Sequence, residues 1–487
     1  HILLHALPHI HCIHQLLYTD TVMLMATHID IIQNLNVYPR FQNQDQKKLI
    51  TLSNLDRQCP LLMYLVFFYK KTSTRDFDSV FSDLKLGLEE TLSVWYPAAG
   101  RLGLDGGGCK LNLRCNGGGA VMVEAMATGV KLSELGDLTQ YNEFYETLVY
   151  KPSFDGDFSV MPLVVAQVTR FACGGYSIGI GTSHSLFDGI SAYEFLHAWA
   201  FNSHIDNKSN GKITKKKEHL VIKPVHARGS LLFNRDMNHS QDAIRVTKAA
   251  AIYHLYQLIK QAMMTHQGQN HNFELTDSSF VIKTFELNGE ALESMKKKSP
   301  EGFSCSSFEF LAAHLWKART MALGLRRDAV VCLQFAVDIR KRTEPPLPEG
   351  FSGNAYVLAS VASTAGELLE ELTLESIVNK IREAKKSIDQ DYINAYMEAL
   401  GGGDQRNDGN LPPIRELTLI SDWTKMPFHN VGFGNRGEPA DYVAPLCPPV
   451  PQVAYFMKNP KDAKGVLVRI GLDPRDVNDF SNNFLGF

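Results

Sequence analysis

The stretch that most constrains the fold is "PLVVAQVTRFACGGYSIGIGTSHSLFDGISAYEFLHAWA", residues 162–200. Two runs of apolar and small residues flank Gly174 and Gly175, which predicts two buried strands joined by a tight turn. The apolar spacing after residue 189 predicts a helix. The second strand therefore delivers His184 to a junction between a strand and a helix, and Asp188 follows four residues later.

Similar alternation continues along the chain. A helix is predicted over 77–95, a buried strand over 329–340 and a second helix over 369–388. The segment "SSFEFLAAHLWKARTMAL" (306–323) predicts a further helix, with Ser306 or Ser307 as its N-cap. Because strands and helices alternate through both halves, the fold class is predicted to be α/β.

Glycine clusters bracket the segment "LDGGGCKLNLRCNGGGAVMVEAM" (104–126). Its alternation of polar and apolar residues predicts a β-hairpin. A glycine run can also cradle phosphate, but this one lacks the Gly-Lys-Ser/Thr ending and a following helix. We therefore prefer the hairpin.

The length of 487 residues exceeds one ordinary core and predicts two domains. Residues 1–24 are histidine-rich and are predicted to be a disordered extension or a gene-model artefact rather than a metal site. Residues 203–219 are polar, basic and nearly free of apolar anchors, as expected of a linker. The predicted domains are accordingly 25–202 and 220–487.

Composition excludes several classes of function. A formal net charge of −3 gives no broad basic face for nucleic acid. No stretch of about 18 apolar residues occurs, so no membrane span is expected. The eight cysteines contain no CxxC pair, which argues against a zinc or redox site and indicates reduced thiols in an intracellular protein.

The junction at His184 suits acid–base chemistry. Neighbouring small residues leave the imidazole open to a ligand, and neutral imidazole removes protons near neutral pH. Asp188 has two alternatives: it accepts a proton from the imidazole, or it holds the turn by pairing with an arginine. Gly189 lets the chain bend. From this pattern alone, His184 is equally explained as a buried histidine that caps the helix.

Residues 167–195 resemble the signature region of the BAHD acyl-CoA-dependent acyltransferases, with its His-x-x-x-Asp-Gly motif. Other similar stretches follow in the expected order: "TLSNLDRQCPLLMYLVFFYK" (51–70), "WYPAAGRL" (95–102), "SSFEFLAAHLWKART" (306–320) and "AVDIRKRTEPPLPEGFSGN" (336–354). The resemblance spans nearly all of the chain from about residue 25 onward. The chain is therefore identified as a member of this family.

The resemblance implies two chloramphenicol-acetyltransferase-like domains, each a mixed β-sheet with flanking helices, that form a V around a solvent channel. It implies that His184 is the general base that deprotonates an acceptor hydroxyl, which then attacks the acyl-CoA thioester. Asp188 corresponds to a structural aspartate that supports the site. No metal or redox cofactor is expected, since acyl-CoA is a co-substrate.

Two further segments carry family features. Ser421 and Trp423 correspond to a hydroxyl residue and a tryptophan that line the pocket, and Ser421 is an oxyanion-donor candidate. A loop serine with a local backbone bond explains Ser421 as well. The second family motif, Asp-Phe-Gly-Trp-Gly, is altered at "GFGN", where Gly432 replaces the aspartate and only Phe433 and Gly434 are kept.

In the family that aspartate pairs with an arginine, which Arg340 would supply here. We therefore expect this ion pair to be missing and Glu438 to meet Arg340 instead. The altered motif keeps two interpretations open, a divergent active enzyme and a protein with altered handling of CoA; intact His184, Asp188 and Gly189 favour activity.

Across its length the chain looks closest to the brassinosteroid-related branch of the family. This resemblance implies esterification of a steroid-hormone hydroxyl, which inactivates the hormone. The alternatives are a phenolic, fatty alcohol or polyamine acceptor, and a non-catalytic scaffold in lipid elongation. Lysines 215–217 and 296–298 are candidates for the CoA phosphates, with solvated surface as the default explanation. A cytoplasmic monomer is expected, with association to the cytosolic face of the endoplasmic reticulum left open.

Overall fold

The computed structural model describes residues 28–42, 48–70, 77–106, 110–204, 221–232, 280–297, 303–400, 414–434, 437–446 and 452–486. The predicted extension (1–24) lies outside these ranges, as does the predicted linker after residue 204. The domain boundary placed there therefore stays a prediction.

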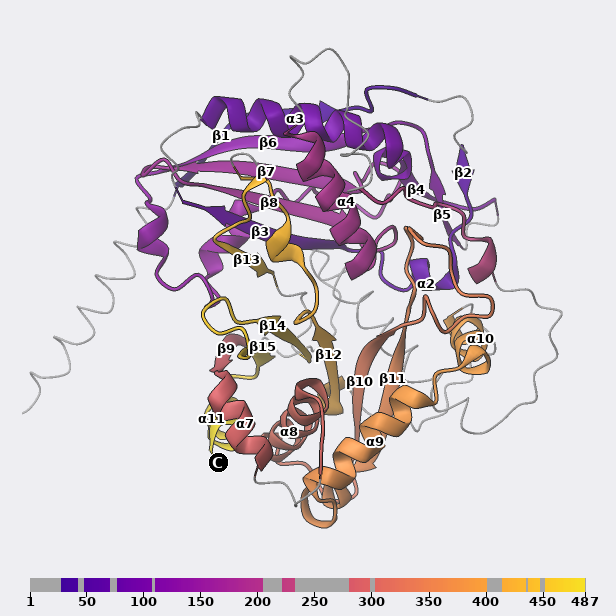
Figure 1. The fold of residues 1–487 in the computed structure, drawn as a ribbon, viewed down its shortest axis with the longest axis vertical. Helices are drawn as coiled ribbons and strands as arrows, with labels where there is room; N and C mark the ends of the chain where they lie inside the picture. The colour runs from indigo at the N-terminus through magenta and orange to yellow at the C-terminus, as the bar shows by residue number, and fades with distance from the viewer. Residues whose placement is uncertain are drawn as a thin grey trace, which may run out of the picture.

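The first domain is built on a six-stranded mixed sheet in the order β1-β6-β7-β8-β3-β13. Strands β6 and β7 are parallel and the other neighbours are antiparallel. Two helices, α3 (Phe77–Val94) and α4 (Gly189–Asn202), lie together over this sheet (Figure 1). The strands are β1 (His28–Val37), β3 (Leu62–Tyr69), β6 (Ala120–Thr128), β7 (Val164–Phe171), β8 (Tyr176–Ser183) and β13 (Tyr442–Pro445).

The second domain repeats this plan with the strand order β11-β10-β12-β14-β15-β9. Strand β12 is parallel to both of its neighbours, so this sheet is also mixed. Its strands are β9 (Val281–Leu287), β10 (Val330–Asp338), β11 (Tyr356–Thr364), β12 (Leu417–Asp422), β14 (Val453–Lys458) and β15 (Val466–Leu472). Its helices are α7 (Gly289–Lys297), α8 (Ser307–Ala322), α9 (Leu374–Lys386), α10 (Gln390–Leu400) and α11 (Val477–Leu485). The prediction of two mixed-sheet α/β domains is confirmed.

Two of the predicted helices show how local signals set element ends. Helix α8 begins after Ser306, whose hydroxyl accepts from the backbone of Glu309 while the Glu309 carboxylate accepts from Ser306 N–H. The helix predicted over 369–388 begins later, at Leu374, because Thr373 caps it. A separate π-helical turn covers Glu367–Glu371.

The hairpin predicted over 104–126 is wrong. Strand β5 (Leu111–Arg114) pairs with β4 (Arg101–Leu104) and β2 (Leu49–Ile50) in a small three-stranded sheet. Strand β6 instead joins the first large sheet beside β7. Gly117 and Gly119, both with positive φ, turn the chain between these sheets. Alternation identifies a strand but not its partner.

The second half of the chain contributes one strand to the first sheet. Residues 442–445 form β13, which pairs with residues 65–68 of β3. Just before it, the fully buried Phe433 ring meets the rings of Phe67 and Trp199 edge-on, with centroids 5.5 and 5.2 Å away. The segment around Phe433 therefore closes the core of the first domain.

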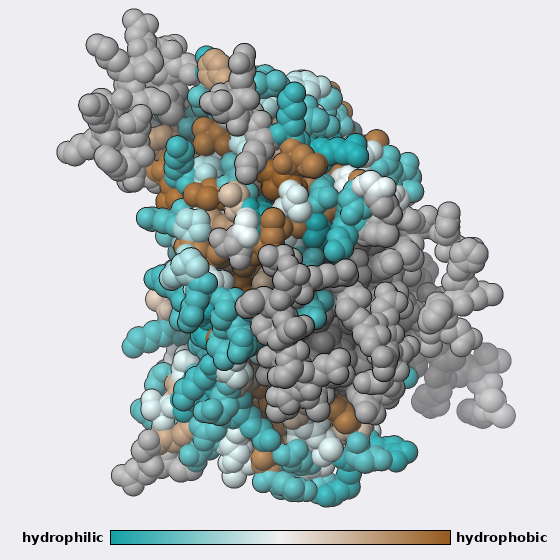
Figure 2. Space-filling view, turned by 90° about the vertical axis from the view of Figure 1, so that its right-hand side faces the viewer, coloured by the Kyte–Doolittle hydropathy of each residue, from teal (hydrophilic) through white to brown (hydrophobic). Residues whose placement is uncertain are grey.

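The described surface differs between the domains. In Figure 2 the upper part, which belongs to the first domain, carries brown apolar patches, while the lower part is mostly teal. Large apolar side chains that are more than half exposed include Tyr38, Phe41, Leu49 and Leu104, all in the first domain. Within the described ranges no helix combines the length and apolar character needed to cross a membrane.

Candidate active site

One face of strand β8 is packed so closely that only glycine fits at residues 179 and 181, and His184 directly follows the strand. A Cβ at Gly179 would lie 2.0 Å from the Leu148 carbonyl oxygen, and one at Gly181 would lie 2.6 Å from the Tyr64 ring. Every residue of the strand is buried. The small-residue sequence "YSIGIGTS" therefore fixes the direction in which the chain leaves the sheet.

The backbone after β8 is held on both sides of His184. The His184 N–H donates to the Leu61 carbonyl at 2.8 Å, which extends the pairing of β8 with β3. Leu186 and Phe187 then enter the core, where the Phe187 ring stacks on Phe195 of α4. His184 itself stays half-buried, so its ring position is set by backbone anchored before and after it.

The imidazole of His184 is oriented by Asn354, a fully buried residue just before β11. The Asn354 amide nitrogen donates to the His184 carbonyl at 2.6 Å and to the Asp56 carboxylate at 3.1 Å. Since both amide hydrogens are used, the amide oxygen must accept from His184 Nδ1, which lies 3.0 Å away. Nδ1 therefore carries the proton, and Nε2 keeps its lone pair.

Asp56 holds Asn354 from the far side. Its carboxylate is fully buried in the short helix α2 (Asn54–Arg57) and also accepts the backbone N–H of Asn354 at 2.9 Å. Arg228 donates from Nε to the other carboxylate oxygen at 3.0 Å, and its side chain is 1% exposed. Ser53, the N-cap of α2, donates to that same oxygen from its hydroxyl and its backbone.

Asp188 adopts the second of its two predicted alternatives, since it pairs with an arginine. Both terminal nitrogens of Arg340 donate to its carboxylate, at 2.8 and 2.9 Å. Asp188 also caps α4 by accepting the Ser191 N–H, and it accepts the Ala355 N–H at 3.0 Å. Burial alone would raise the pKa of Asp188, but the Arg340 charge and these hydrogen bonds outweigh it and lower that pKa.

The ion pair between Arg340 and the motif's aspartate is missing as expected, since residue 432 is glycine, but the prediction that Glu438 replaces that aspartate is wrong. Besides Asp188, Arg340 binds Asp338 at 2.7 Å and the Gly353 carbonyl at 3.2 Å. Glu438 instead lies in the loop of the altered motif, where its backbone carbonyl accepts from Gly434 N–H. Arg340 follows β10 directly, so the sheet of the second domain aims it at the start of α4 and away from that loop.

The altered motif forms a tight turn with a structural fit of its own. A Cβ at Gly432 would lie 2.2 Å from the Gly437 carbonyl oxygen, so the family's aspartate has no room there. The Gly432 carbonyl accepts from His204 Nε2 at 2.8 Å, and a Cβ at Gly434 would lie 2.6 Å from the Glu438 carbonyl. Phe433 between them fills the core of the first domain.

Ser421 and Trp423 lie together at the end of β12. The Trp423 indole N–H donates to the Ser421 hydroxyl oxygen at 2.8 Å. The chain that follows crosses the first turn of α4, where a Cβ at Gly189 would lie 3.3 Å from the Met426 side chain. Within the described chain neither residue hydrogen-bonds to His184, but this crossing brings their segment to the helix that begins beside it.

Sequence reasoning missed Asn354, Asp56 and Arg228. Asp56 and Asn354 do lie in stretches that carry the family resemblance, and the capping box of Ser53 and Asp56 is a local signal for α2. Arg228 carries no comparable signal. It reaches Asp56 because Val225 pairs with Phe351, which lays this segment beside the chain that leads to Asn354.

Two cavities in the second domain have charged linings, of both signs in the first and mainly cationic in the second. One, of about 310 Å³, lies between the start of α8 and the end of β12, with Ser307, Asp422, Lys458 and Lys464 among its lining residues. Lys296, one of the predicted lysine candidates, is half-buried and donates to the hydroxyl of that Ser307. Lys215–217 lie outside the described residues, so their prediction stays open.

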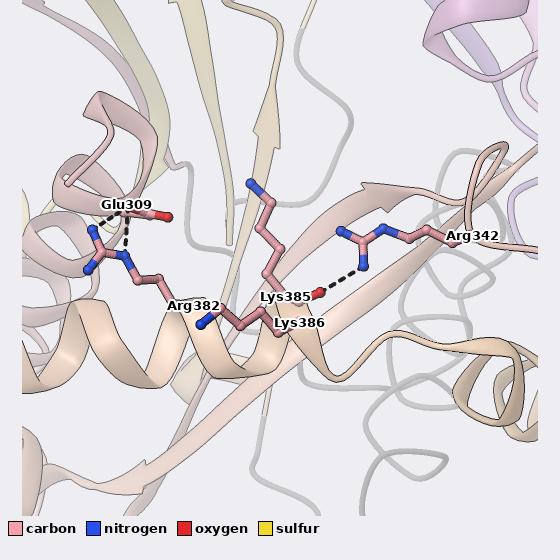
Figure 3. A pocket seen from close by; sticks show the side chains of 5 residues that line it. All are labelled: Glu309, Arg342, Arg382, Lys385 and Lys386. Atoms are coloured by element: carbon pink, nitrogen blue, oxygen red, sulfur yellow. Dashed lines mark hydrogen bonds and ion pairs between the residues drawn. The ribbon is translucent and has the colours of Figure 1, made fainter.

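The second cavity, of about 480 Å³, has a mainly cationic lining of Glu309, Arg342, Arg382, Lys385 and Lys386. Figure 3 shows Arg382 directed at Glu309, to which it donates, and Arg342 directed at the backbone carbonyl of Lys385. Both arginines are thus already engaged by protein groups. This cavity offers an anion fewer free donors than its cationic lining suggests.

Comparisons with known proteins place the chain among acyltransferases. The model described as Transferase family matches residues 27–485. "Brassinosteroid-related acyltransferase 1" of Arabidopsis thaliana is 87% identical over 463 residues, which cover 95% of this chain and 99% of that protein. "Omega-hydroxypalmitate O-feruloyl transferase" of the same plant is 30% identical over 94% of this chain and 93% of its own length.

Solved structures share the fold. Vinorine synthase matches with a TM-score of 0.67 over 94% of this chain and 98% of its own, at 18% identity. TRI101 of F. graminearum, complexed with coenzyme A and T-2 mycotoxin, matches with a TM-score of 0.67 at 14% identity, over 88% of this chain and 96% of its own. At these identities the match concerns the two-domain architecture alone.

Proposed function

The chain belongs to the Transferase family, the BAHD acyltransferases, and from this membership we propose that it esterifies a hydroxyl of a small hydrophobic acceptor with an acyl group from acyl-CoA. One observation carries the proposal: the Asn354 amide oxygen lies 3.0 Å from His184 Nδ1 and accepts its hydrogen, so the neutral imidazole has its lone pair on Nε2. An imidazole in that tautomer is suited to act as a general base on an alcohol.

In the proposed reaction, His184 Nε2 removes the hydroxyl proton as the acceptor oxygen attacks the thioester carbonyl. The tetrahedral intermediate then collapses, the C–S bond breaks, and the imidazolium returns its proton to the CoA thiolate. The products are an ester and free CoA, so protons and electrons balance without a further reactant. General-base catalysis of this kind contributes about 10²- to 10⁴-fold.

Ser421 is the proposed donor to the developing oxyanion. Its hydroxyl oxygen already accepts from Trp423, so its own hydrogen is free to donate elsewhere. Loss of one oxyanion donor typically lowers kcat about 10²- to 10³-fold. We expect Ser421→Ala to lower kcat by that amount, and Ser421→Thr, which keeps the hydroxyl, to retain most of the activity.

We place the phosphates of acyl-CoA at the cavity beside Ser307. Lys458 and Lys464 on its lining supply positive charge, and Lys296 lies beside it, bound to Ser307 and to Glu293 of the lining. Asp422, also on the lining, directly follows Ser421. Lys296→Gln should raise KM for acyl-CoA and leave kcat within about twofold, since it removes binding shared by ground and transition states. Lys385→Gln, in the cavity of Figure 3, is the matched control and should leave both constants unchanged.

The proposed acceptor is a brassinosteroid. Its support is the name of the Arabidopsis relative that shares 87% of its residues with this chain over nearly the full length of both. A relative at 30% identity is named for a hydroxylated fatty acid, so a hydroxylated fatty acid is the competing acceptor. Both are hydrophobic alcohols, so either can lose its hydroxyl proton to the same base.

The deciding experiment measures CoA release by the purified protein with a panel of acyl-CoAs, brassinosteroids and ω-hydroxy fatty acids. His184→Gln should abolish turnover, whereas His197→Gln, a half-buried histidine beside Tyr193 on α4, should retain it. Turnover of brassinosteroids above the fatty acids supports the acceptor. If neither the wild type nor His184→Gln releases CoA although both bind acyl-CoA, the proposal is overturned in favour of the scaffold alternative.

A further inference from the structure

We propose that the buried Asp56–Arg228 pair is the positioning unit of the base, and that it acts on His184 through the amide of Asn354. This inference rests on the proposed function, since it assigns residues to the base of that reaction. The motif aspartate, Asp188, plays no part in it, because its carboxylate is taken up by Arg340 and by backbone donors.

The argument begins with the amide of Asn354. A rotation of that amide by 180° would place its oxygen against two acceptors, the His184 carbonyl and the Asp56 carboxylate, and would leave His184 Nδ1 facing an NH₂ group. The rotated state would favour a proton on Nε2, the nitrogen that must be unprotonated to act as the base. The orientation of one amide therefore decides whether His184 can act.

Asp56 is what makes the rotation unfavourable. One of its oxygens accepts from both the side chain and the backbone of Asn354, at 3.1 and 2.9 Å. Its other oxygen is held by Arg228 and Ser53. The carboxylate is fully buried, so water cannot replace these bonds. A neutral amide at position 56 has only one oxygen, so it cannot accept from Asn354 and Arg228 at once. The choice of one orientation of Asn354 is then left mainly to the His184 carbonyl and is weaker.

Arg228 fixes the carboxylate in turn. Its Nε donates to Asp56, its Nη1 donates to the His226 carbonyl at 2.9 Å, and its guanidinium lies over the Phe351 ring, 5.3 Å from the centroid. These three contacts leave the side chain a single orientation. Within the described part of the chain, neither Arg228 nor Asp56 hydrogen-bonds to the imidazole of His184, so they are positioning residues.

The test has two readouts, and the first needs no substrate. In protein labelled with ¹⁵N-histidine, the His184 resonances are assigned by their loss in His184→Gln. The wild type should show a protonated Nδ1 and a bare Nε2, and Asp56→Asn should show a mixture of tautomers. A wild-type His184 protonated on Nε2 would overturn the proposal even if the variant failed to fold.

The second readout is kinetic. Asp56→Asn should lower kcat on the order of 10- to 100-fold, as loss of an indirect orienting partner does, with KM for both substrates within about twofold. Asn54→Ala is the matched control: it removes a side chain of the same helix that donates to the Met397 carbonyl, but leaves the bonds from Asp56 to Asn354, Arg228 and Ser53, so kcat and the tautomer should stay as in the wild type.

An equal fall of kcat in Asn54→Ala and Asp56→Asn would mean that α2 matters only for folding, and it would overturn the proposal. Failure of the proposed function is distinguishable. Full activity in His184→Gln would show that His184 is not the base, whichever tautomer the wild type has, and would refute the proposed function. Loss of activity in His184→Gln together with an unchanged tautomer in Asp56→Asn would refute only the positioning role of Asp56.

Discussion

Asp188→Asn removes one charge beside the catalytic centre without changing the size of the side chain. The carboxylate accepts five hydrogen bonds, from two nitrogens of Arg340, from Ala355 N–H, and from the backbone and hydroxyl of Ser191. An asparagine amide in its place directs its NH₂ group toward some of these donors, which it cannot accept from. Arg340 then keeps Asp338 as its one carboxylate partner among the described residues, and the Asp338 side chain is 43% exposed. Because breaking a buried pair costs 3–5 kcal/mol and one partner remains, we expect a loss of about 3 kcal/mol.

Urea unfolding at pH 7, followed by tryptophan fluorescence and circular dichroism, measures this loss. The matched control is Asp338→Asn, which removes the exposed partner of the same arginine and should cost less than about 1 kcal/mol. The two variants thus separate the buried from the exposed carboxylate around one guanidinium.

The difference between wild type and Asp188→Asn should depend on pH. Folding lowers the pKa of Asp188 below its ordinary 3.8, because the Arg340 charge and the hydrogen bonds outweigh burial. The stability it contributes is therefore present above pH 3.8 and is lost as the pH falls through the folded-state pKa. The reasoning is refuted if Asp188→Asn unfolds within 1 kcal/mol of the wild type at pH 7, or if Asp338→Asn costs as much.

Three further substitutions test separate parts of the structure. Burial lowers the pKa of His226 to about 4; wild-type stability should therefore fall by up to about 3 kcal/mol as the pH drops from 6.5 toward 4, and thermal melts of His226→Asn should lack most of this slope. Gly432→Asp restores the family's residue yet should lower the melting temperature, because its Cβ would lie 2.2 Å from the Gly437 carbonyl; an unchanged melt would contradict this. Gly181→Ala should destabilise by about 1–3 kcal/mol through its clash with the Tyr64 ring and should lower kcat as β8 shifts, which melts and CoA release measure together.

Sequence patterns predicted the elements whose signals are local. The capping box at Ser306 and Glu309 marks the start of α8, and the turn at Gly174–Gly175 separates β7 from β8 where expected. Partners in the sheets are not encoded in this way. The β5 segment alternates correctly for a hairpin with β6, but it pairs with β4, because alternation is satisfied by any strand that offers an apolar face.

The site shows the same limit. His184 and Asp188 lie close together in the sequence, so one motif identified both. The groups that act on them come from far along the chain: Asn354 is 170 residues from His184, and Arg340 is 152 residues from Asp188. The sequence suggested an arginine for Asp188 but assigned Arg340 to the altered motif, since no local pattern shows which carboxylate a distant cation will meet.

Two buried contacts between the halves of the chain converge on one dipeptide, Asn354–Ala355. The backbone N–H of Asn354 donates to Asp56, and that of Ala355 donates to Asp188, so two buried carboxylates of the first domain clamp adjacent residues of the second. A buried ion pair adds little stability over well-packed apolar residues. We therefore explain the two buried pairs, Asp56–Arg228 and Asp188–Arg340, by their role in positioning the residues that they hold rather than by a gain in stability.

This arrangement also separates the base from the altered family motif. Phe433 and its glycines contact Phe67, Trp199 and His204, which belong to the core and the far end of α4. The clamp at Asn354 uses none of these residues. A change at Gly432 therefore acts on the packing of the first domain and leaves intact the groups that orient His184, which is why loss of the motif's aspartate is compatible with an active acyltransferase.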